Sequence, residues 1–189
     1  MQNSVMQAIL GRRSCRSFAQ DKAVREQDLL AVLEAGAYAP SAMNTQSWHF
    51  TAVTNGQKLQ ELNAAMLSRM DDAARARAAG RAGDRPVSPF YNAPVMILVS
   101  LKNGGSPYPE ADCACALENM FLAAASLGLG TCWINQLRGA TTADPHAGEV
   151  LRALGVPDGY TIHGCCALGY ADKESPAKER AAGVVNIVK

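Results

Sequence analysis

The strongest constraint on the fold is a pair of segments that are apolar on nearly every side. Residues 93–101, APVMILVSL, form a continuous apolar run after a proline, which predicts a strand covered on both faces. Residues 110–130, EADCACALENMFLAAASLGLG, are apolar nearly all the way round and end in two glycines, which predicts a helix buried in a core or a subunit interface. Any fold of this chain must therefore cover both segments with other elements.

The remaining elements alternate between helical and extended periodicity. The patterns predict helices over 4–13, 25–40, 56–85 and 144–157, and strands over 48–55, 131–135, 160–171 and 184–189. This order predicts one mixed α+β domain over residues 1–189. The helix over 56–85 becomes polar and Ala/Gly-rich toward its end, so residues 66–92 are expected to form a mobile, exposed flap.

The last predicted strand, VVNIVK at 184–189, is separated from the core by the polar stretch ADKESPAKERAAG. Such a strand must find a sheet edge to pair with, and an edge on a second copy is one solution. A disordered tail is the alternative, because terminal residues often fray.

Composition excludes several function classes. The formal net charge of +1 argues against a broad nucleic-acid surface, so any basic site must be local. Apolar runs are too short to cross a membrane, and Met1 leads straight into QNSVMQAIL without a basic leader, which predicts a cytoplasmic chain.

The six cysteines stand at positions 15, 113, 115, 132, 165 and 166. Without a secretory signal, reduced thiols are expected. The pair at 113 and 115 is too close for the usual zinc spacing, and the three histidines show no ligand pattern. Small buried side chains are the favoured interpretation, with a redox or metal role as the alternative.

Four clusters could carry chemistry. The group Arg12, Arg13, Ser14 and Arg16 suits a planar anion such as a phosphate ester, although solvent, nucleic acid or an acidic partner would also accept it. The loop 39–50 presents amides that can read the edge of a polar ring. Glycines within 127–134 allow a backbone to approach a flat ligand. Two cations, Lys178 and Arg180, lie in the loop 175–180. Each cluster alone is equally explained by helix capping, turn chemistry or a solvated surface.

Together these clusters resemble the FMN-dependent nitroreductase family, in its short single-domain form, over essentially the whole chain. RRSCRSF resembles the family's Arg-Arg-Ser-x-Arg-x-Phe motif, and APSAMNTQSWHF its Ala-Pro-Ser-x-x-Asn-x-Gln-x-Trp signature. NAPVMILV, ENMFLAAASLGLGTCWI and LGYADKESPAKER resemble its Ala-Pro strand, its central helix with a glycine turn, and its closing Leu-Gly-Tyr and Pro-x-Lys-x-Arg elements. Five motifs in the family's order make the resemblance specific.

The resemblance implies a mainly antiparallel sheet flanked by helices, and a homodimer that exchanges its C-terminal strands and holds FMN at the subunit interface. The FMN phosphate would be held by Arg12, Arg16, Lys178 and Arg180, with Arg13 and Ser14 contacting the phosphate, ribityl or ring atoms. Pro40, Ser41, Asn44 and Gln46 would meet the flavin from the other subunit. The backbone around Gly130 and Thr131 would reach the reactive face and the N5 edge. The chain departs from the family at Glu118 and Cys113, which are expected to leave the flavin motifs untouched.

The implied activity is an oxidoreductase in which NADH or NADPH gives a hydride to flavin N5 and leaves. A small acceptor such as a nitroaromatic or quinone then takes its place, which gives ping-pong kinetics, with residues 66–92 on the acceptor side. The cofactor carries the redox chemistry, so no catalytic side chain and no metal site is expected. Two alternatives stay open: a non-catalytic FMN-binding or flavin-storage protein, and a cysteine-based redox or metal protein.

Overall fold

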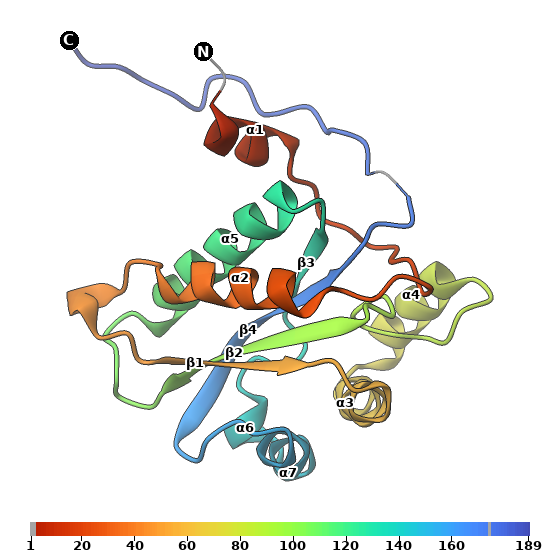
Figure 1. The fold of residues 1–189 in the computed structure, drawn as a ribbon. Helices are drawn as coiled ribbons and strands as arrows, with labels where there is room; N and C mark the ends of the chain where they lie inside the picture. The colour runs from red at the N-terminus through yellow and green to blue at the C-terminus, as the bar shows by residue number, and fades with distance from the viewer. Residues whose placement is uncertain (1–2, 174) are drawn as a thin grey trace.

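Four strands form one antiparallel sheet in the order β1-β2-β4-β3 (Figure 1). They span Trp48–Val53 (β1), Val95–Lys102 (β2), Gly130–Ile134 (β3) and Tyr160–Gly169 (β4). The computed structural model describes residues 3–173 and 175–189. Each of the first four predicted strands is confirmed, and the mixed α+β class with a mainly antiparallel sheet is confirmed with them.

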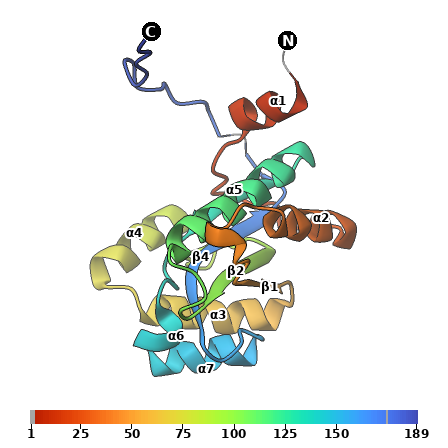
Figure 2. The ribbon, with the colours of Figure 1, turned by 90° about the vertical axis from the view of Figure 1, so that its left-hand side faces the viewer.

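Helices cover both faces of the sheet (Figures 1 and 2). The α-helices are Ser4–Gly11 (α1), Glu26–Ala37 (α2), Gly56–Ser68 (α3), Asp72–Ala82 (α4), Pro109–Ser126 (α5), Ala140–Ala143 (α6) and Pro145–Ala153 (α7), and a 3₁₀ turn, η1, spans Ala42–Asn44. The helices α2 and α5 pack on one face, whereas α3, α6 and α7 lie against the other.

The position of β2 between two hydrophobic cores explains why its sequence is apolar throughout. Ile97 and Val99 pack with Leu117 and Met120 of α5, and Met96 and Leu98 join the core on the opposite face. All six of these side chains are fully buried, and each such burial contributes roughly 1.5–3 kcal/mol. The prediction of a strand covered on both faces is confirmed. The helix α5 buries one face, which includes Leu117 and Met120, whereas Ala111 and Glu118 are exposed in this chain, so burial of its other face stays a prediction.

The predicted helix over 56–85 is divided into α3 and α4. The break occurs because Asp71 adopts an extended backbone conformation and its side chain accepts a hydrogen bond from the Ala74 N–H, which starts a new helix. Within 66–92, Met66 and Phe90 belong to the core, and Ala78 is the one α4 residue that is buried. The flap's two ends are therefore anchored, and its mobility stays a prediction.

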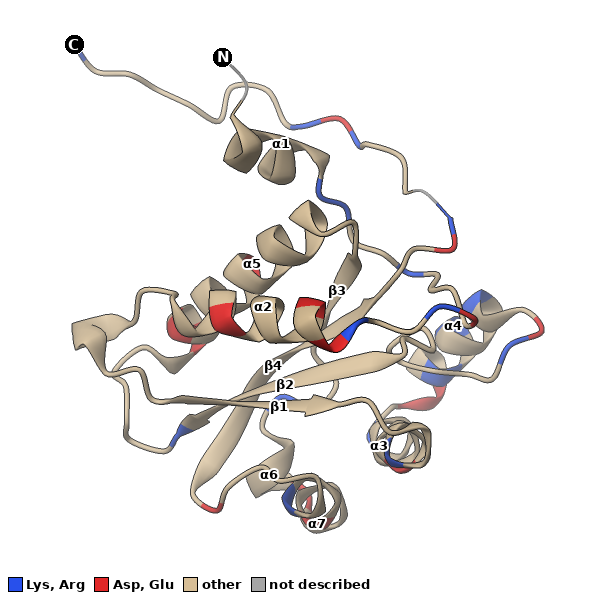
Figure 3. Cartoon of the chain, in the orientation of Figure 1, with Lys and Arg blue, Asp and Glu red and all other residues tan. Residues whose placement is uncertain are grey.

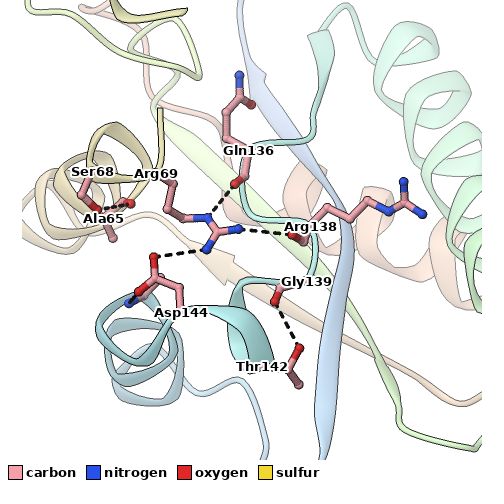
Figure 4. Close-up of polar contacts among 9 residues, drawn as sticks. Ala65, Ser68, Arg69, Gln136, Arg138, Gly139, Thr142 and Asp144 are labelled. Carbon is pink, nitrogen blue, oxygen red and sulfur yellow. Dashed lines mark hydrogen bonds and ion pairs between the residues drawn. The ribbon is translucent and has the colours of Figure 1, made fainter. Parts of the chain in front are cut away.

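Arg69, at the end of α3, ties this region to the loop that follows β3 (Figure 4). Its Nε donates to the Gln136 carbonyl at 3.1 Å, its Nη2 to the Arg138 carbonyl at 3.5 Å, and its Nη1 pairs with Asp144 Oδ2 at 3.2 Å. Asp144 also caps α7 by accepting from the Ala147 N–H. One guanidinium thus joins three elements.

Both ends of the described chain lie apart from the core. The helix α1 has no buried residue, and its apolar side chains Val5, Met6, Ile9 and Leu10 are exposed. Residues 175–189 contain no strand or helix within this chain and extend past α1 (Figure 1). The strand expected over 184–189 is therefore not formed inside a single chain. No helix among the described residues has the length and apolar character needed to cross a bilayer.

Candidate functional site

The arginine-rich segment that follows α1 is fixed to the sheet through Cys15. The Cys15 N–H donates to the Thr131 carbonyl at 2.8 Å, and Ser14 and Thr131 form an isolated parallel bridge. Arg12 ends α1, with its N–H bonded to the Ala8 carbonyl. The cationic residues on either side of Cys15 are therefore held beside the start of β3.

The segment that follows β4 lies beside the same arginine-rich segment. Past β4, the Ala19 N–H donates to the Tyr170 carbonyl and the Asp172 N–H to the Ser17 carbonyl, each at 2.9 Å. The Ser175 hydroxyl then donates to the Ser14 carbonyl at 3.2 Å. These contacts bring the two ends of the sequence side by side.

The result is a hollow of about 310 Å³, called the cationic hollow below, lined by Arg12, Arg13, Ser14, Arg16, Ser175, Pro176, Lys178 and Arg180. Figure 3 shows basic residues both in the segment after α1 and in the C-terminal segment that passes it. All six residues proposed from the sequence for the phosphate region are therefore brought together. Guanidinium forks and an ammonium group are the donors that a phosphate ester requires, so these residues fit the phosphate end of FMN.

Two of these arginines already have partners. The Arg13 Nη1 donates to the Leu10 carbonyl at 2.7 Å and to the Arg12 carbonyl at 2.8 Å, and so caps the end of α1. The Arg12 Nε lies 3.6 Å from Glu118 Oε1. The expectation that Glu118 would leave the flavin motifs untouched is wrong, because α5 packs against the end of α1 and its acidic side chain reaches an arginine of the hollow.

The loop 39–47 lies at the other end of α5 from α1 (Figure 1). The Ala42 N–H donates to Asp112 Oδ1 at 2.8 Å, and the Ser41 hydroxyl accepts the Gln46 N–H at 3.0 Å. The Gln46 amide donates to Asn44 Oδ1 at 2.9 Å. Pro40, Ser41, Asn44 and Gln46 are therefore clustered with one another, but none of them lines the cationic hollow of the same chain.

This loop is strained in a way that favours a binding role. Met43, Asn44 and Gln46 have φ values of 52°, 54° and 45°, in the left-handed region that side-chain-bearing residues seldom adopt. The Met43 side chain is 88% exposed, so packing in this chain does not compensate for its conformation. Backbone strain of this kind is concentrated at functional sites.

Gly130 and Thr131 begin β3 beside the cationic hollow. Gly130 lines a neighbouring hollow of about 500 Å³ together with Gly11, Arg12 and Lys173. Thr131 is buried, and its carbonyl is the acceptor for Cys15. Contact of their backbone with a flavin stays a prediction.

The cysteines are free thiols in the described residues, and all except Cys115 are buried. Burial raises the pKa of Cys113 to about 12 and raises the pKa of Cys15, Cys132 and the Cys165–Cys166 pair as well. Buried thiols with a raised pKa are inert toward redox exchange. The prediction of buried cysteines is confirmed for five of the six, and their reduced state stays a prediction.

Comparison with known proteins agrees with this geometry. The family model for the nitroreductase family matches residues 9–170. A nitroreductase from Bacteroides fragilis, crystallised with bound FMN, is 43% identical with a TM-score of 0.86, and each chain covers 100% of the other. An FMN-bound nitroreductase from Desulfitobacterium hafniense is 30% identical with a TM-score of 0.88, again with 100% coverage of both chains.

A curated relative from Archaeoglobus fulgidus, whose assigned name combines NADH dehydrogenase with NAD(P)H nitroreductase, is 27% identical over 171 residues. This match spans 89% of the present chain and 86% of the relative. The fold is thus the one found in nitroreductases that have been crystallised with bound FMN. The chain belongs to the nitroreductase family.

Proposed function

We propose that the protein transfers reducing equivalents from NADH or NADPH to nitroaromatic, quinone or related small acceptors. The oxidised nucleotide leaves first, and the acceptor then binds at the same site. The observation that carries the proposal is the convergence of Arg12, Arg16, Lys178 and Arg180 on one hollow from opposite ends of the sequence. When bound, FMN supplies the hydride-accepting and hydride-donating chemistry. The protein's part is to hold the cofactor, to orient it and to exclude water.

The arginines and Ser14 of the cationic hollow have different tasks in this proposal. Arginine side chains stay charged at all relevant pH values, so the hollow offers a fixed positive charge to the dianionic phosphate. Ser14, held in the parallel bridge to β3, would contact the ester or the ribityl chain. The contact with Glu118 orients Arg12, at the cost of part of its attraction for an anion.

A second copy of the chain completes the site in this proposal. The loop with Pro40, Ser41, Asn44 and Gln46 lies away from the cationic hollow of its own chain, so it would reach the flavin of a partner. Two apolar surfaces support association: the exposed face of α1, and the C-terminal side chains Val184, Val185, Ile187 and Val188, which are 74–89% exposed. Exposed apolar side chains gathered in this way are typical of a protein interface. Exchange of residues 184–189 onto a partner's sheet edge would cover the second group.

The deciding experiment starts with the purified protein's flavin absorbance. Bound FMN that is bleached by NADH or NADPH without oxygen, and restored by a nitroaromatic or quinone, supports the proposal. Flavin that stays oxidised in the presence of both nucleotides would instead indicate a storage protein.

Two charge variants then connect the activity to the site. The double variant Lys178→Ala/Arg180→Ala should bind FMN at least about 100-fold more weakly, since hydrogen bonds to charged groups contribute about 1.5–3 kcal/mol each. Arg152→Ala, at an exposed position in the last turn of α7, is the matched control and should retain FMN. Equal FMN affinity in all three proteins would refute the assignment of the cationic hollow.

A further inference from the structure

A second basic hollow lies between α4, the segment after Cys15 and the end of β4. Its volume is about 280 Å³, and four cationic side chains line it: Arg16, Arg81, Arg85 and Lys173. It shares Arg16 alone with the cationic hollow. We call it the α4 hollow, and nothing in the proposed contacts with FMN uses its three other cations.

The charge in the α4 hollow exceeds what its own carboxylate can balance. Asp172 also lines it, accepting from Arg85 Nη2 at 3.0 Å and from the Ser17 hydroxyl at 3.0 Å. These two donors lower the pKa of Asp172, so it is ionised at neutral pH. Four cations against one carboxylate leave a large positive excess, which attracts an anion carrying more than one charge.

Ser88 gives an independent indication of a missing partner. It lines the α4 hollow and is 8% exposed, and its hydroxyl oxygen is buried without a hydrogen-bond partner. A buried hydroxyl left unpaired costs roughly 1–3 kcal/mol. A ligand oxygen beside the cations would remove this cost.

Hydrogen bonds join the wall that carries Ser88 to neighbouring segments. The Asn92 amide donates to the Pro86 carbonyl at 3.0 Å, the Gln20 amide donates to the Asn92 carbonyl at 3.0 Å, and the Asn63 amide donates to the Val87 carbonyl at 3.1 Å. The guanidinium of Arg81 lies 5.8 Å from the centre of the Tyr91 ring. These contacts connect the wall to Gln20 and Asn63 and place Arg81 beside Tyr91.

We propose that the α4 hollow binds the 2′-phosphate of NADPH, so that the protein prefers NADPH to NADH as electron donor. Guanidinium forks match the oxygens of a phosphate, and a phosphate monoester carries close to two negative charges, whereas a carboxylate carries one. Arg81 and Arg85 supply the charge, and the Ser88 hydroxyl donates to a phosphate oxygen. This inference rests on the proposed function, because it identifies the donor of the same reaction.

The first test is binding, measured on the FMN-loaded protein by calorimetry. Adenosine 2′,5′-bisphosphate should bind at least tenfold more tightly than adenosine 5′-monophosphate, and this advantage should be lost in Arg81→Gln and Arg85→Gln. Arg77→Gln is the matched control, because Arg77 is an exposed α4 arginine that is absent from the lining of the hollow. Equal binding of the two nucleotides to the unaltered protein would overturn the proposal.

Ser88→Ala separates a ligand contact from a structural role. Removal of an unpaired buried hydroxyl should leave the free energy of unfolding unchanged or increase it, while the bisphosphate affinity falls by about threefold to tenfold. A variant that loses stability without losing nucleotide affinity would refute the assigned role.

The second test compares reduction of the bound flavin by each nucleotide in the absence of oxygen. The ratio of the NADPH rate to the NADH rate should fall about tenfold in Arg81→Gln and stay constant in Arg77→Gln. Flavin that is reduced by both nucleotides with an unchanged ratio would overturn this inference and leave the proposed function standing. Arginine variants that slow only reoxidation, for instance by 4-nitrobenzoate, would assign the hollow to an anionic acceptor and refute the donor assignment.

Discussion

Replacement of Gly130 by alanine is expected to loosen the attachment of the arginine segment to the sheet. A Cβ atom on Gly130 would lie 2.7 Å from the Cβ and 2.9 Å from the Sγ of Cys15. Ordinary carbon contacts lie at about 3.5–4.0 Å, so the two segments would have to separate by about 1 Å. That shift acts directly on the 2.8 Å hydrogen bond between the Cys15 N–H and the Thr131 carbonyl.

Overpacking of this kind costs about 1–3 kcal/mol. For a chain of this length, each kcal/mol lowers the Tm by about 2–4 °C, so a decrease of about 2–12 °C is expected. Because the displaced segment carries Arg12 and Arg16, FMN affinity should fall together with stability. Thermal unfolding and flavin titration of the same preparations measure the Tm and the FMN affinity.

Gly80→Ala is the matched control. Gly80 lies inside α4, where an added Cβ would meet no atom within 4 Å, and alanine in a helix is favoured over glycine by about 0.5–1 kcal/mol. The same substitution should thus stabilise the protein at position 80 and destabilise it at position 130. Cys15→Gly should restore part of the loss in the double variant. A Gly130→Ala protein with unchanged stability and FMN affinity would refute the reasoning.

Three further changes test other parts of the structure. Glu118→Gln should tighten FMN binding by about twofold to fivefold in a flavin titration, because an exposed ion pair contributes about 0.2–1 kcal/mol and its loss frees an arginine of the cationic hollow. Arg69→Ala should reduce the free energy of unfolding by about 1–3 kcal/mol, since the Gln136 carbonyl and the Asp144 carboxylate lose their charged donor. The capping hydrogen bond from Ala147, followed by the Arg69 contact, lowers the pKa of Asp144. The stabilising effect of the ionised Asp144 carboxylate is therefore complete above the pKa of an unfolded aspartate, about 4, and is lost as the pH falls below that value. The stability difference between the unaltered protein and Asp144→Asn should shrink in acid unfolding curves below that pH.

The sequence predicts the elements whose periodicity is strong. The run at 93–101 is buried on both faces of the sheet, and the helix at 110–130 buries the face that packs on it; long apolar patterns of that kind have few other outcomes. The division of the helix over 56–85 is missed because a side-chain cap at Asp71 outweighs the helical tendency of the residues around it.

The order of the sequence motifs predicts which residues form the cationic hollow, but it does not predict their contacts with other side chains. Nothing in local sequence places Glu118 beside Arg12, because that contact depends on how α5 crosses the end of α1. The α4 hollow is also not visible in the sequence. Arg16, Arg81 and Lys173 come from three distant segments, and the unpaired hydroxyl of Ser88 is recognisable only after the fold has buried it.

The bond between Ser175 and Ser14 has a consequence for biosynthesis. Nearly the whole polypeptide separates Arg12 from Arg180, so a ribosome releases the first half of the cationic hollow long before the second. Under the proposed function, nascent chains and proteolytic fragments that stop before residue 178 should bind FMN much more weakly even when their sheet is folded. Flavin fluorescence quenching during translation would therefore report that residues 178–180 have left the ribosome.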